Sequence, residues 1–97
     1  MSSQDKAAAF HHAAFVMDGL VYHSDGEPAT LRAGGIDAIN LTVAHFEADF
    51  AGACRQMAGW HARLAAPDSP WRLIERVADF DAAKAAGQVG IVMGWQN

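Results

Sequence analysis

The sequence has 97 residues, 52% hydrophobic and 19% charged, which are the proportions of an ordinary globular domain and not of a disordered chain. Its formal net charge of −4 gives no electrostatic reason to expect nucleic acid or an anionic membrane as a partner. The single cysteine, Cys54, excludes an internal disulfide and is typical of a reducing compartment, so we expect a cytoplasmic protein.

The first fourteen residues predict a helix and no targeting segment. Ser2 or Ser3 can cap a helix that runs to about Ala13 and is rich in alanine. His11 and His12 interrupt the apolar stretch that a signal peptide would need, and adjacent helical positions diverge too far to share one ligand. No run approaches the roughly 18 apolar residues of a membrane helix.

The next segment predicts a strand, a turn and a short helix. Residues 15–17 form an apolar run that predicts a buried strand, and residues 20–22 either extend it or form an adjacent turn. Turn residues at 24–26 lead to a helix over 27–33, with proline in its first turn. Gly34 and Gly35 should end that helix, because glycine accepts the left-handed conformation of a helix C-terminus.

Residues 36–43 give the clearest strand in the sequence. Alternation divides it into an apolar face and a face of small or polar side chains, which are Ala38, Asn40 and Thr42. The interior face of a barrel accepts small or polar groups near the strand ends, so Asn40 and Thr42 stand out.

An amphipathic helix is expected from the Asp49 cap to about Leu64. Its apolar positions recur at helical spacing and are Phe50, Cys54, Met57, His61 and Leu64, with Trp60 beside them. We interpret Cys54 and His61 as core residues and not as catalytic ones, since a buried cysteine without an activating neighbour is inert. Trp60 and Trp71 are expected to fill the space between helix and sheet.

The remaining chain again alternates extended segments with a helix. Residues 66–70 form a loop, 71–77 are expected to be extended, and 79–86 form a helix whose late Lys84 suits the helix dipole. Gly87 should stop this helix, and 89–95 form a final apolar strand.

This alternation predicts an α/β fold with parallel strands and right-handed crossovers. We expect one domain over residues 1–97, with a helical lead at 1–14 and three barrel strands with their helices at 15–97. Because a complete (β/α)8 barrel, or TIM barrel, takes about 250 residues, the chain should be its opening βα units, incomplete and with open sheet edges. Open edges predict marginal stability or self-association.

Three segments carry a resemblance to a known family: FVMDGLVYHSDG at 15–26, LRAGGIDAINLTV at 31–43 and VADFDAAKAAGQVGIVMGWQN at 77–97. Together with the Trp60 helix they resemble the start of the membrane (renal) dipeptidase family of zinc metallopeptidases. The resemblance implies a (β/α)8 barrel whose complete members hydrolyse dipeptides, or related small amides, with two bridged metal ions at the carboxyl ends of the strands. It also implies that the histidines completing the metal site lie on later strands.

The family's ligand positions hold other residues here. Aligned on Asp18-Gly19, the positions of the first-strand histidine and aspartate are Leu20 and Tyr22, and the bridging glutamate is replaced by Gln96. Neither Leu20 nor Tyr22 is an ordinary zinc ligand, and a neutral amide supplies no bridging charge.

Two further sets of residues remain open. His23 and Asp25 could restore metal binding by a slip of three residues, or they could belong to a solvated turn. His45 and Glu47, after the second strand, either contact substrate or are ordinary polar loop residues. Trp95 and Gln96 are placed with His45 as substrate-binding candidates at the barrel mouth.

Three functions follow. The chain is part of a dipeptidase-type metalloenzyme acting on a small dipeptide-like substrate, or a relative with a degenerate metal site that binds a small ligand, or a module that assembles through its open sheet edges. For the 97-residue chain alone we predict no peptidase activity.

Overall fold

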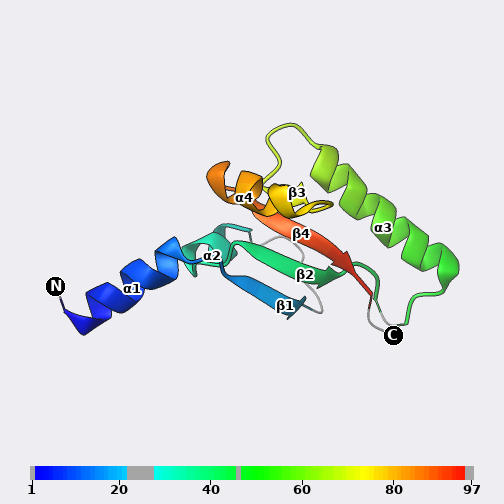
Figure 1. Cartoon of the computed structure of the whole chain (residues 1–97). Coiled ribbons are helices and arrows are strands. Elements are labelled where there is room, and N and C mark those ends of the chain that lie inside the picture. Colours follow the sequence, from blue (N-terminus) through cyan, green and yellow to red (C-terminus); the bar gives the residue numbers. More distant parts are fainter. Residues whose placement is uncertain (1, 22–27, 46, 96–97) are drawn as a thin grey trace.

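The computed structural model describes residues 2–21, 28–45 and 47–95 (Figure 1). Helices and strands alternate along them in the order α1 (Ser3–Ala13), β1 (Met17–Val21), α2 (Pro28–Ala33), β2 (Ala38–Thr42), α3 (Phe50–Ala65), β3 (Trp71–Leu73), α4 (Val77–Ala85) and β4 (Val89–Gly94). The strands form one sheet in which every neighbouring pair is parallel. The predicted α/β class, with parallel strands alternating with helices, is confirmed.

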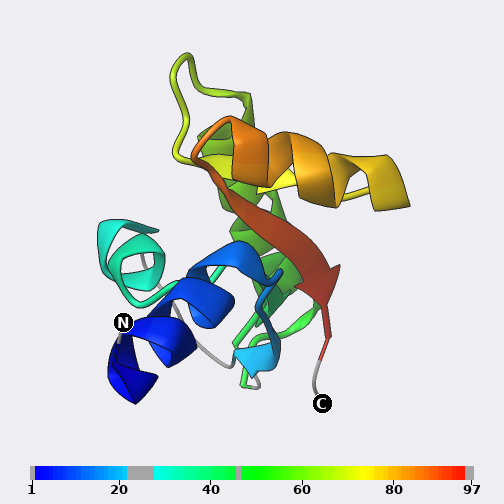
Figure 2. The same ribbon diagram turned by 60° about the vertical axis from the view of Figure 1, so that its left-hand side comes forward.

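The order of the strands differs from the expected succession of three. The described sheet has four strands in the order β1-β2-β4-β3, because residues 71–73 of the segment predicted only to be extended pair with the outer edge of β4. The crossover from β2 to β3 and the crossover from β3 to β4 therefore run in opposite directions across the sheet. Right-handed connections then place α3 and α4 on opposite faces, and in Figure 2 α3 passes behind β4 while α4 lies in front of it.

The first strand begins later than the apolar run suggested. It starts at Met17, and Leu20 and Val21 extend it as one of the two alternatives proposed. Phe15 instead packs its ring edge against Phe80 of α4, with 5.5 Å between the ring centroids. The prediction of a buried strand at residues 15–17 is therefore wrong, because Phe15 and Met17 are exposed and only Met17 belongs to β1.

Glycines end α2 and α4 as predicted. Gly35 has a φ of 83° and Gly87 a φ of 71°, the left-handed conformation that glycine adopts without strain. Beyond Gly35 the Ile36 amide donates to the Leu31 carbonyl, and an equivalent bond follows Gly87. Each helix thus turns directly into the strand after it, β2 or β4.

The core lies between α3 and one face of the sheet. Trp60 of α3 packs edge-on against Trp71 of β3, with 5.5 Å between their ring centroids, as expected of these two side chains. Around them is a cluster of buried residues from the sheet and its ends, which are Ile39, Leu41, Val43, Val89 and Ile91. Met57 and Leu64 of α3 and Leu31 of α2 pack against this cluster.

The buried face of α3 differs from the predicted one. Cys54 and His61 are exposed, so their interpretation as core residues is wrong, and Phe50 is 86% exposed. The buried positions are Ala53 and Trp60. A stripe through residues 53, 57, 60 and 64 is rotated by roughly 50° from the stripe through 50, 54, 57, 61 and 64, and the two stripes share positions 57 and 64. Both stripes contain apolar side chains, and burial of the large indole selects the first.

Candidate functional site

The carboxyl ends of β1, β2 and β4 lie at the same edge of the sheet, because these strands are parallel (Figure 1). In barrels built from parallel strands, ligands and catalytic groups gather at this end. The described residues that reach it are Val21 on β1, residues 42–45 on and after β2, and Gly94 and Trp95 on and after β4. We call this region the carboxyl edge.

A β-bulge disturbs β1 just before this edge. Asp18 pairs with Ile39 but Val21 pairs with Leu41, so β1 contains one residue more than its partner over this span. The Leu20 amide donates to the Asp18 carboxylate at 3.0 Å, which stabilises the irregular backbone. Bulges commonly re-aim side chains beside functional sites. The position that the family resemblance assigns to a histidine falls within this bulge.

The metal ligands that the resemblance implies are not found among the described residues. Leu20 is 61% exposed and offers no donor atom. Tyr22, His23, Asp25 and Gln96 lie outside the described residues. Within residues 2–21, 28–45 and 47–95, no three His, Cys, Asp or Glu side chains are close enough to hold a metal ion. The described residues alone therefore do not form the two-metal centre that the resemblance implies.

Two substrate-binding candidates do reach the carboxyl edge. His45 is exposed, and its Nδ1 accepts a hydrogen bond from the Glu47 amide at 3.2 Å, which in the neutral ring places the proton on Nε2. The His45 amide donates to the Gln56 side chain, anchoring the loop to α3. Trp95, directly after β4, is 58% exposed. Their placement at the edge agrees with the sequence expectation, while contact with substrate stays a prediction.

The polar side chains of β2 occupy the other face of the sheet from the core. The register pairs Asn40 with Val92 and Thr42 with Gly94, so all four lie on the face that carries Ala38 and Gly90. Thr42 is buried and Asn40 is half-buried. The predicted division of β2 into an apolar and a small or polar face is therefore confirmed.

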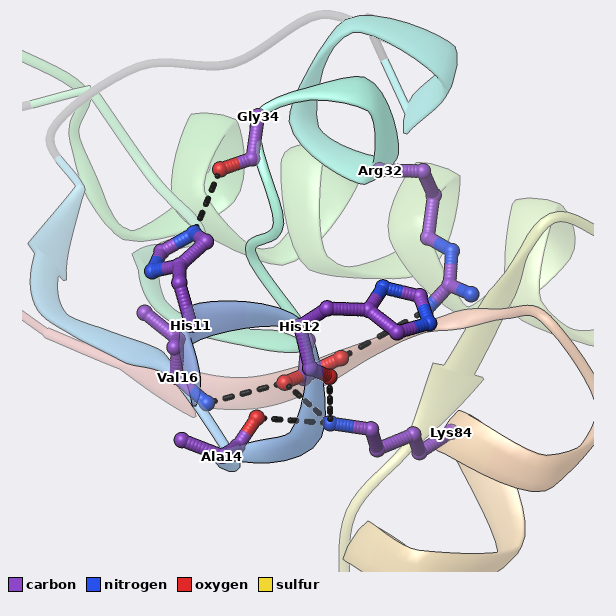
Figure 3. Close-up of polar contacts among 8 residues, drawn as sticks. His11, His12, Ala14, Val16, Arg32, Gly34 and Lys84 are labelled. Carbon is purple, nitrogen blue, oxygen red and sulfur yellow. Dashed lines mark hydrogen bonds and ion pairs between the residues drawn. The ribbon is translucent and has the colours of Figure 1, made fainter. Parts of the chain in front are cut away.

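A second polar group lies at the opposite end of the strands (Figure 3). Asp37, only 5% exposed, accepts hydrogen bonds on Oδ2 from the Val16 amide at 2.8 Å and from the Lys84 Nζ at 3.1 Å. The Arg32 guanidinium lies 3.6 Å from Asp37 Oδ1. We call Asp37, Lys84, Arg32 and the nearby His11 the basal cluster.

Lys84 and His11 extend the basal cluster to the end of α1. Lys84 also donates to the Ala14 carbonyl at 2.7 Å and to the His12 carbonyl at 3.3 Å, which uses all three of its N–H groups. The His11 Nε2 lies 3.0 Å from the Gly34 carbonyl. Lys84 lies in the last turn of α4, where a cation suits the helix dipole as expected, and it also caps α1. Groups at the amino end of parallel strands ordinarily serve stability and not chemistry.

Asp79 likewise has a structural role, at the start of α4. Its Oδ2 accepts hydrogen bonds from the Glu75 and Arg76 amides at 2.9 Å each, at the start of α4. These bonds hold the pKa of Asp79 below its ordinary 3.8, because they stabilise the charged form. Its carboxylate is therefore not a free ligand.

No helix in the described part of the chain is long and apolar enough to cross a membrane.

Comparison with known proteins places the fold. No protein-family model matches the sequence, and no curated protein sequence matches it. The structure is similar to the crystal structure of an amidohydrolase from Pseudomonas aeruginosa, with a TM-score of 0.79 and 29% sequence identity. The match covers 93% of this chain and 28% of that chain. Amidohydrolases have a TIM-barrel-type fold. Over nearly all of its residues, the chain is therefore similar to a section of a hydrolase of this kind.

Proposed function

We propose that the chain is the amino-terminal βα section of an amidohydrolase-type metallohydrolase that cleaves dipeptides or related small amides. The observation that carries the proposal is the similarity to the Pseudomonas amidohydrolase, which extends over 93% of this chain at a TM-score of 0.79. Because the chain spans only 28% of that protein, activity is proposed for a protein that also contains the remaining barrel.

The choice of dipeptides rests on the sequence resemblance. Asp18-Gly19 at the first strand, the Gly34-Gly35 turn and the Gly87-ended helix match the dipeptidase pattern. The structure adds that the two glycine turns lead directly into β2 and β4. In the complete protein, bound metal ions would polarise the scissile carbonyl and supply a nucleophilic water.

For the 97-residue chain alone we predict no hydrolysis, because the resemblance places the completing histidines on later strands. The test compares this chain with a protein that continues through the remaining barrel strands. We expect the longer protein to hydrolyse a panel of dipeptides, chelator to abolish the activity, and the short chain to be inactive. Dipeptide hydrolysis by the pure short chain, or none by the longer protein with metal added, would contradict the proposal.

The alternative is a relative with a degenerate metal site that binds a small ligand. It is favoured by Leu20, an exposed apolar residue at a position where the family has a histidine. Elemental analysis of the longer protein separates the two functions. Two equivalents of zinc per chain would exclude the degenerate site, whereas one equivalent or none would favour it.

A further inference from the structure

We propose that the side-chain amide of Asn40, lying across Gly94, is a binding group that recognises the amide of a small ligand at the carboxyl edge. Nothing in the dipeptidase resemblance assigns a role to Asn40. The inference rests on the proposed function for the class of ligand, and its geometry stands on β2 and β4 alone.

The register of β2 and β4 places Asn40 diagonally to Gly94. Asn40 is paired with Val92 and Thr42 with Gly94, so Gly94 lies two residues further along β4 on the same face. A Cβ built on Gly94 would overlap the Asn40 Oδ1. The Asn40 side chain therefore leans toward the carboxyl ends of the strands and lies where a side chain at residue 94 would be.

Residue 94 is a glycine because a side chain there would collide with Asn40, and not because the backbone needs a left-handed conformation. The φ of Gly94 is not positive, unlike those of Gly35 and Gly87. The nearest atoms to the imagined Cβ belong to Asn40 and to the Leu41 carbonyl oxygen, which would be 3.2 Å away. The absence of a side chain at residue 94 thus creates the notch that holds the amide.

The amide in this notch has hydrogen-bonding capacity to offer. Within the described ranges no hydrogen bond is made by the Asn40 side chain, which is half-buried. It carries two donors and one acceptor oxygen in a plane, an arrangement that a second amide complements. Its neighbours on this face, Thr42 and Val92, are uncharged. A neutral polar group is the ligand of choice, because a carboxylate there would lose hydration without gaining a countercharge.

The test uses the 97-residue chain, labelled with ¹⁵N, and N-acetylglycinamide as the amide probe. Saturable movement of the Asn40 side-chain NH₂ signals is expected. Gln88 provides the internal control, because its amide already donates to the Ser69 carbonyl and accepts from Arg72. Its signals should stay fixed, and sodium acetate should move neither pair. Equal movement of the Asn40 and Gln88 signals, or no saturable movement, would overturn the inference.

Two variants test the geometry. Asn40→Ala should weaken binding of the probe about tenfold, the worth of one or two hydrogen bonds. Gly94→Ala should also weaken binding and should lower stability, whereas the double variant should regain the stability because the obstructing amide is gone. Unchanged affinity in Asn40→Ala would refute the binding role, and a double variant as unstable as Gly94→Ala would refute the notch. If the longer protein hydrolyses dipeptides but Asn40 does not respond to the probe, only this inference is refuted. If Asn40 responds to the probe but the longer protein hydrolyses no dipeptide, only the proposed function is refuted.

Discussion

Lys84 shows how much one side chain can contribute when all of its donors are used. Its ammonium group joins α4 to a buried carboxylate on one side and to the last carbonyls of α1 on the other. Hydrogen bonds to charged groups contribute more than neutral ones, and a buried charge that loses its partner is costly. The Arg32 guanidinium is the second cation beside Asp37, but at 3.6 Å from Oδ1 it is more distant than the Lys84 Nζ, which lies 3.1 Å from Oδ2.

We predict that Lys84→Met lowers the free energy of unfolding by about 2 kcal/mol, because it removes three donors and leaves Asp37 with a more distant cation. Urea denaturation followed by circular dichroism measures the change. The matched control is Lys6→Met, which alters the other lysine, an exposed residue of α1. Equal effects of the two substitutions would show that loss of charge, and not the basal cluster, is responsible.

At this scale the sequence predicted residue types better than contacts. Asn40 and Thr42 stood out because polar residues in a buried strand are unusual, and the structure places both on the predicted face. The partnership of Asp37 with Lys84 was not predictable, because the two residues are far apart in sequence and charge alone names no partner. The position of Asn40 beside Gly94 was not predictable either, because it depends on the β2–β4 register, which no local sequence pattern reveals.

Among the elements, α3 depends on one large side chain. Trp60 is buried against Trp71, and the Arg63 guanidinium lies 4.7 Å from the centre of the Trp60 ring. Two apolar stripes run along this helix, and Trp60 determines which one faces the sheet. The exposed stripe still carries Phe50 and Cys54.

We expect Trp60→Ala to lower the unfolding free energy by about 3 kcal/mol or more, because it leaves a large cavity in the core. Phe50→Ala is the matched control on the same helix and should change it by less than about 0.5 kcal/mol, since Phe50 is exposed. Thermal denaturation of the two variants is sufficient to compare them. A larger loss for Phe50→Ala would mean that the other stripe is the buried one.

Helix ends were more predictable than strand starts. Glycines at 34–35 and 87 end their helices through a local backbone conformation, so the signal lies in adjacent residues. The start of β1 was misplaced because Phe15 is apolar for a different reason, its contact with Phe80. The exposed Cys54 shows the same limit, since periodicity identified a helix but not its orientation.

For the whole molecule, both outer strands leave one edge unpaired within the described sheet. Met17 and Leu20 on β1 are exposed apolar residues beside that edge. Unpaired strands of this kind pair readily with another chain. The parallel class was predictable from the alternation of elements, but the position of β3 was not, because a strand of three residues has no periodicity of its own.

We predict self-association of the chain through the β1 edge. Sedimentation velocity should show species heavier than the 10.3 kDa monomer, and Leu20→Lys should shift them toward the monomer by placing a charge on the edge strand. Phe10→Lys, which adds the same charge to exposed α1, should have little effect. A monodisperse monomer for the unaltered chain would remove the reason to consider an assembly role.

The strand order has a consequence for how the chain reaches this structure. β1-α2-β2 and β3-α4-β4 are two local units, each pairing strands about 20 residues apart, whereas β2 and β4 meet across about 50 residues. Closing the longer loop costs about 0.8 kcal/mol more in chain entropy than closing either shorter one. The pairing of β2 with β4, which also brings Asn40 beside Gly94, is thus the contact that connects the two local units.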